Sequence, residues 1–171
     1  FPELIAEEPD KKTGIIIVVP AFNEPGINVL LDSLSLCEKP ECRTEVIIVV
    51  NSPADAQDEC LQNNKKCVEN IESWKKENIN SFFRLFVLNA GQPSIDGWGV
   101  GLARKTGMDE ALRRFDKINK PDGVIVSLDA DCKVAKNYFT ALSEDLQKKK
   151  GRSACSIYFE HLLSANDFPE N

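Results

Sequence analysis

Two carboxylates, in the triplet Asp129-Ala130-Asp131, directly follow the apolar run Gly123–Leu128. Like charges this close repel each other by about 1–4 kcal/mol, depending on the local dielectric. A fold tolerates such a pair when a cation or a donor-rich ligand offsets the repulsion, and carboxylate oxygens are ligands that Mg²⁺ or Mn²⁺ prefers. The other interpretation is a solvated Asp-rich turn, because Asp is common where a strand ends. The triplet alone does not separate a metal site from such a turn.

The elements that must position these carboxylates alternate between strand and helix patterns. Apolar, β-branched runs predict strands at Gly14–Val19, Glu45–Val50, Phe82–Leu88 and Gly123–Leu128, with a fifth at Ala154–Phe159. Helical patterns separate them at Ile27–Cys37, Asp58–Asn78, Gly101–Phe115 and Ala135–Lys149. This alternation predicts βαβ units and therefore an α/β protein, a three-layer α/β/α sandwich around a mostly parallel, Rossmann-like sheet.

Polar loops follow each of the four main runs. They are Pro20-Ala21-Phe22-Asn23-Glu24, Asn51-Ser52, the Gly-rich stretch Gly97-Trp98-Gly99-Val100-Gly101, and the acidic triplet. Ligands of open α/β sheets bind outside the carboxyl ends of the strands, so we expect these loops to meet at one rim. Each loop also has a structural interpretation. Pro and Asn can end a strand and start a helix, and Asn51 and Ser52 can form a turn or hydrogen-bond a base.

The sequence from Gly97 to Gly107 matches neither of two common phosphate-binding motifs. A Walker A loop needs Gly before Lys-Thr, but Arg104 precedes Lys105-Thr106, and the same Arg104 stands where a dinucleotide fingerprint needs its third Gly. The remaining prediction is a helix N-terminus near Gly101 that receives phosphate, with Arg104 or Lys105 nearby. The alternative is a tight turn followed by a solvated helix face. Trp98 could be buried there or offer a stacking face.

The amino-acid composition limits the classes of function that the protein can have. The 171 residues, 28% of them charged and 42% hydrophobic, fit one globular domain over 1–171. The net charge of −6 argues against a nucleic-acid partner. No apolar run approaches the roughly 20 residues of a transmembrane segment. The six cysteines form no C-x-x-C motif and His161 is the single histidine, so we expect no zinc-binding set of ligands. We expect the six cysteines to be reduced thiols, as in a cytoplasmic protein.

Taken in order, these motifs resemble family 2 glycosyltransferases of the GT-A fold. The matching residues are Ile15–Glu24, Val46–Ser52, Gly101–Gly107 (similar to a Gly-x-Ala-Arg-Asn-x-Gly helix start) and Leu128–Asp131 (similar to a D-x-D motif). The resemblance extends from about Gly14 to Leu142 and lies in the ordered combination of motifs rather than in any one of them.

The resemblance implies an inverting, hexosyltransferase-type enzyme that takes a UDP- or GDP-sugar as donor and a glycan, lipid or other hydroxyl as acceptor. It implies that Pro20, Ala21, Phe22, Asn23, Glu24, Asn51 and Ser52 line the nucleoside, with Gly101, Arg104 and Ala130 also at the donor site. It places Asp129 near the ribose and makes Asp131, together with Asp129, the ligands of Mn²⁺ or Mg²⁺.

Two features depart from the family pattern. Asn51 and Ser52 replace an acidic pair, so uridine recognition is not implied. The family's catalytic base lies well downstream of D-x-D, so we expect it beyond Asn171, with this chain supplying mainly the donor site of an enzyme truncated on its acceptor side. The alternatives are a nucleotidyltransferase, or a non-catalytic nucleotide-binding or scaffold module.

Overall fold

The computed structural model describes residues 2–53, 55–91, 99–148 and 153–160. The elements follow the order β1 Thr13–Ala21, α1 Asn28–Ser35, β2 Arg43–Asn51, α2 Asp58–Glu77, β3 Phe83–Gly91, α3 Val100–Lys117, β4 Val124–Ser127 and α4 Tyr138–Leu142, which continues as a π-helix over Ser143–Lys148.

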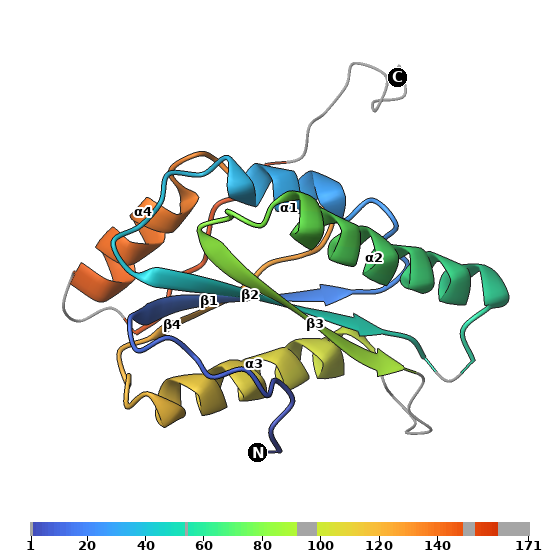
Figure 1. Ribbon diagram of the computed structural model, residues 1–171, viewed down its shortest axis with the longest axis horizontal. Coiled ribbons are helices and arrows are strands. Elements are labelled where there is room, and N and C mark those ends of the chain that lie inside the picture. The colour runs from blue at the N-terminus through green and yellow to red at the C-terminus, as the bar shows by residue number, and fades with distance from the viewer. Residues whose placement is uncertain (1, 54, 92–98, 149–152, 161–171) are drawn as a thin grey trace, which may run out of the picture.

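The four strands form one parallel sheet in the order β3-β2-β1-β4 (Figure 1). Helices α1, α2 and α4 lie over one face of the sheet and α3 lies over the other (Figure 1). Two cores result, because successive residues of a strand point to opposite faces. Ile15, Ile17 and Val19 pack on the α1 and α2 side, whereas Ile16 and Val18 pack on the α3 side. The predicted three-layer α/β fold is confirmed.

One strand prediction is wrong. Ala154–Phe159 has no regular secondary structure and exposes its apolar side chains, with Tyr158 81% and Phe159 73% exposed. A β-branched and aromatic run becomes a strand only where a neighbouring strand offers backbone partners, and no described strand pairs with it. The predicted helix at Ala135–Lys149 begins later, at Tyr138, because the Tyr138 N–H donates to the Ala135 carbonyl in a preceding turn at 3.0 Å.

Helix α3 approaches the sheet closely at Gly107. A Cβ atom at this position would overlap Cγ1 of Val18 and would lie 3.0 Å from Cγ2 of Val49. Glycine therefore lets the helix backbone lie directly on β1 and β2, and the following turns bury Ala111 and Phe115. This contact fixes where the N-terminal turn of α3 meets the carboxyl ends of the strands.

A buried ion pair holds the other end of α3 to the sheet. The Arg114 guanidinium donates to both carboxylate oxygens of Glu45, at 2.6 and 2.9 Å, and both side chains are fully buried. Arg114 also donates to the Glu7 carbonyl at 2.8 Å and lies over the Phe86 ring at 4.7 Å. Because breaking such a pair leaves an uncompensated buried charge, it fixes the register of α3 against β2.

We expect Gly107→Ala to destabilise the protein by about 1–3 kcal/mol, because the added methyl must push α3 away from Val18 and Val49. The matched control is Gly101→Ala in the same helix. A Cβ there meets nothing within 4 Å, so alanine should leave stability unchanged or raise it by up to about 1 kcal/mol. Urea unfolding measures both. Equal effects at the two positions would contradict the close approach.

Candidate functional site

The site depends on the pairing of β1 with β4. The ladder runs from Ile15 opposite Val124 to Val18 opposite Ser127, and the Leu128 N–H then donates to the Val18 carbonyl at 3.0 Å. This last bond delivers the acidic triplet beside the end of β1. The chain builds β2 and β3 on one side of β1 and then crosses to β4 on the other, so the order of strands switches at this point. Crevices at such switch points are the usual ligand sites of open α/β sheets.

A cavity of about 400 Å³ opens at this switch point. Its walls come from the loop after β1, the first turns of α3 and the loop after β4, and the lining residues are Pro20, Phe22, Glu24, Val100, Arg104, Asp129, Ala130 and Asp131. We call it the acidic cleft. Its size lies within the range of small-molecule sites. Three of the four predicted loops contribute to it.

One wall of the acidic cleft carries positive charge. Arg104 Nη2 lies 2.7 Å from Oδ1 of Asp129, with the two side chains 35% and 63% exposed. Arg104 Nε is buried and has no hydrogen-bond acceptor in the described part of the chain. Helix α3 begins at Val100 on the same wall, and among the described residues no side chain caps its N-terminus, where Gly99 is the N-cap residue. The helix dipole therefore adds to the guanidinium charge.

The acidic cleft is also lined by two further carboxylates, Glu24 and Asp131. Burial raises the pKa of the Glu24 carboxyl above its ordinary value, and repulsion by Asp131 raises it further. Asp131 itself is exposed. A cavity that combines carboxylates with a guanidinium and a helix N-terminus suits a ligand that brings a cation and an anion together.

The residues present fit a cation shared with a ligand rather than a closed protein site. No group of three or more His, Cys, Asp or Glu side chains in residues 2–53, 55–91, 99–148 and 153–160 is arranged to hold a metal ion. Mg²⁺ commonly binds through one or two carboxylates, with phosphate and water oxygens completing its shell. Asp129 and Asp131 supply that donor set, and all of their candidate ligand atoms are oxygens.

The remaining residues that the sequence predicts at the donor site differ in how deeply they are buried. Ala21 is buried in the core beneath α1 and does not line the cleft. Gly101 is exposed in the first turn of α3, and Asn23 is exposed in the loop after β1. Asn51 is buried, and its Oδ1 has no hydrogen-bond partner among the described residues. Trp98, for which the sequence allows either burial or a stacking face, lies outside the described residues, as does His161.

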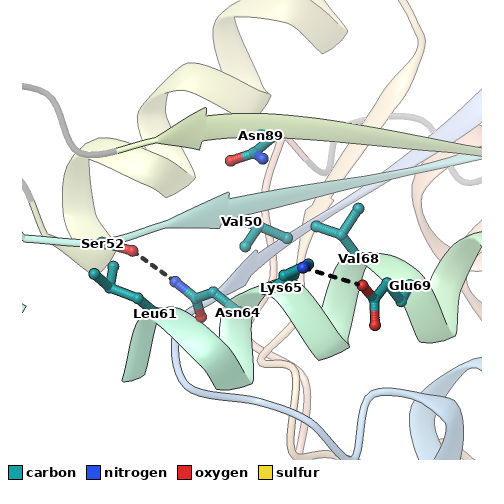
Figure 2. Close-up of a pocket in the computed structure, with 8 residues that line it drawn as sticks. All are labelled: Val50, Ser52, Leu61, Asn64, Lys65, Val68, Glu69 and Asn89. Carbon is teal, nitrogen blue, oxygen red and sulfur yellow. Dashed lines mark hydrogen bonds and ion pairs between the residues drawn. The ribbon is translucent and has the colours of Figure 1, made fainter. Parts of the chain in front are cut away.

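Ser52 lines a second cavity, of about 470 Å³, between α2 and the ends of β2 and β3 (Figure 2). Val50, Leu61 and Val68 form its apolar part, and the polar lining residues are Ser52, Asn64, Lys65, Glu69 and Asn89. Within this cavity Asn64 donates to Ser52 Oγ at 2.7 Å, and Lys65 pairs with Glu69 at 3.9 Å (Figure 2). Of the nucleoside residues predicted from the sequence, Pro20, Phe22 and Glu24 line the acidic cleft and Ser52 lines the second cavity. The other three, Ala21, Asn23 and Asn51, line neither.

The sequence analysis missed the side chains that support the loop after β1. Asn64 Oδ1 accepts from the Asn23 N–H at 2.8 Å, and Asn63 Nδ2 donates to Asn23 Oδ1 at 2.8 Å. One signal was present in the sequence. Asn64 stands within the apolar stripe of α2, which also buries Cys67, Ile71 and Trp74, and a buried carboxamide in such a stripe needs hydrogen-bond partners.

Comparisons with known proteins give a likeness of fold. No protein-family model matches the chain, and no curated protein matches it. The crystal structure of S. aureus TarS 1-349 superposes with a TM-score of 0.51 at 19% identity, over 84% of this chain and 38% of that one. The same TarS fragment in complex with UDP-GlcNAc gives a TM-score of 0.48 at 17% identity, over 84% and 37%.

The first likeness shows that the two chains share an α/β fold and nothing finer, and the second adds nothing to it. The chain spans about two fifths of the TarS fragment that it matches. Among the residues that the structure describes, no helix is long and apolar enough to span a membrane.

We expect Asp131→Asn to lower the pKa of the Glu24 carboxyl, because the substitution removes the repulsion that opposes ionisation of Glu24. The decrease should be partial, since burial is the larger cause and remains. Carboxyl ¹³C NMR titration measures it. Asp129→Asn is the matched control and should leave Glu24 nearly unchanged. A Glu24 pKa that does not respond to Asp131→Asn would show that the two carboxyls do not face one another.

Proposed function

We propose that this chain is the donor-binding part of a cytoplasmic, family 2-like glycosyltransferase that transfers a hexosyl group from a UDP- or GDP-sugar to a hydroxyl of a glycan, lipid or other acceptor. The supporting observation is the acidic cleft at the β1/β4 switch point, which is lined by Glu24 and Asp131 together with Arg104 and the first turn of α3. The fold shared with the TarS fragment is consistent with this role.

The acidic cleft suits the diphosphate and its cation. Asp131 and Asp129 would hold Mn²⁺ or Mg²⁺. Such an ion, when bound, would supply Lewis-acid stabilisation of the charge that develops on the departing nucleoside diphosphate. Arg104 can donate to a phosphate oxygen through the guanidinium N–H groups that Asp129 does not engage. The N–H groups of the first turn of α3 that lack a partner within the helix would donate to the same oxygens.

The loop after β1 suits the nucleoside. Phe22 lines the cleft and is 37% exposed, so one part of its ring is available to stack on a base or a sugar. Asp129 would contact the ribose, and Ser52 with Asn51 would approach the base from the end of β2. No catalytic base is assigned to the described residues, because the carboxylates of the cleft all belong to the donor side. The inverting course of transfer follows the family resemblance alone.

We expect the 171-residue chain to bind UDP or GDP only when Mn²⁺ or Mg²⁺ is present, and Asp131→Asn to weaken this binding by roughly tenfold or more. The physical reason is the loss of one charged oxygen ligand from a site where the protein supplies few. Isothermal titration calorimetry measures the affinity. Asp122→Asn, at an exposed carboxylate before β4, is the control and should bind as the wild type does.

The same titrations separate the alternatives. Binding of a nucleoside triphosphate with release of pyrophosphate would indicate a nucleotidyltransferase. Nucleotide binding that is indifferent both to the metal and to Asp131→Asn would indicate a non-catalytic module. Absence of binding by any nucleoside diphosphate to the folded chain would refute the proposed function.

A further inference from the structure

Helix α2 holds the loop after β1 through three carboxamides. Asn64 and Asn63 both bond to Asn23, through its backbone N–H and its side-chain Oδ1 respectively, each at 2.8 Å. One further contact, from Asn70 Nδ2 to the Pro25 carbonyl at 2.9 Å, lies at the outer end of the loop. Loops usually satisfy their backbone groups with water or with their own turns, so a helix that supplies these partners constrains the loop.

Asn64 also holds the end of β2. Its Nδ2 donates to the Asn51 carbonyl at 2.8 Å. The same Nδ2 donates to Ser52 Oγ at 2.7 Å (Figure 2). The carbonyl of Asn51 can only accept and the N–H of Asn23 can only donate, so these two partners fix which way the amide of Asn64 faces. Asn64 is 7% exposed. One buried side chain therefore joins the loop after β1 to the loop after β2.

The Asn23 backbone needs this support. Its φ of 59° lies in the left-handed region, which among non-glycine residues asparagine adopts most readily when its polar groups are hydrogen-bonded. Asn23 itself points away from the acidic cleft toward α2, whereas its two neighbours, Phe22 and Glu24, line the cleft. Asn23 and its two neighbours therefore contact different parts of the protein, and the left-handed φ of Asn23 belongs to this arrangement.

We propose that Asn64 is a positioning residue for the donor site: by binding the Asn23 N–H and the Asn51 carbonyl, it holds Phe22 and Glu24 in the conformation that faces the acidic cleft. The part of this inference that concerns ligand binding rests on the proposed function. The contact itself exists without a ligand, so it can be tested without one.

The carboxamide side chain of Asn64 favours a positioning role over a role in packing α2 against the sheet. The neighbouring members of the buried stripe on α2 are Cys67, Ile71 and Trp74, and an apolar residue would complete that stripe. A leucine at position 64 would fill a similar volume but would leave the Asn23 N–H and the Asn51 carbonyl without partners. The loop would then relax toward ordinary backbone angles and water.

The experiment compares Asn64→Leu with the matched control Asn70→Leu, which removes a bond from the same helix to the same loop at an exposed position. Hydrogen exchange is measured on the ligand-free chain. The Asn23 amide should exchange roughly tenfold or more faster in Asn64→Leu, while the amides of Ile15–Val19 and the control variant stay unchanged. Calorimetry with UDP and Mn²⁺ should show roughly tenfold weaker binding for Asn64→Leu alone.

A second variant keeps the test decisive if leucine prevents folding. Asn64→Asp retains an acceptor for the Asn23 N–H and loses both donors, so the Asn23 amide should stay protected as in the wild type. The inference is overturned if Asn23 exchanges at the wild-type rate in Asn64→Leu, or if it exchanges fast in Asn64→Asp. If the wild type bound no nucleotide, the proposed function would fall, and the exchange rates would still decide the role of Asn64.

Discussion

The parallel pairing of β1 with β4 is the constraint on which the rest of the site depends. Without the bond from the Leu128 N–H to the Val18 carbonyl, the acidic triplet would be a solvated turn with no opposing wall. The pairing brings Asp131 beside Glu24, which lies more than a hundred residues earlier in the chain. It does so at β1, which has β2 and β3 on one side and β4 on the other. The crevice is therefore a consequence of topology, and the side chains only determine what enters it.

The acidic cleft contains one favourable and one unfavourable interaction between charged groups, and this difference supports a ligand-binding role. Asp129 has a partner in Arg104, whereas Glu24 and Asp131 repel each other while Glu24 is partly buried. A protein selected only for stability would relieve that repulsion with a basic residue or a neutral one. The buried pair of Glu45 and Arg114 shows how this chain neutralises a carboxylate when the role is structural: two short hydrogen bonds and complete burial. The contrast between the two pairs favours a ligand-binding role for the cleft.

Much of the fold could be predicted from the sequence, because apolar runs and helical stripes are local signals. The ends of β1, β2 and β4 were therefore placed to within a few residues, and with them the loops that meet at the cleft. Contacts that depend on helix rotation could not be predicted. Arg104 and Lys105 are adjacent in the sequence, but only Arg104 faces the cleft, while Lys105 binds Asp109 one turn along α3. The support of Asn23 by Asn64 and the burial of Arg114 likewise depend on packing between distant segments. The run Ala154–Phe159 carries a strand pattern without a described strand beside it, so its local preference is not realised.

The central claim is that the loops after β1 and β4 form a single site for a cation and a diphosphate. Paramagnetic broadening in the NMR spectrum of the chain with UDP and a small proportion of Mn²⁺ tests this directly, since the ion broadens the amides that lie nearest to it. We expect the amides of residues 22–24 and 129–131 to broaden together, while those of the Lys117–Asp122 turn at the far end of α3 remain sharp. Broadening of one loop without the other, or of neither, would contradict it.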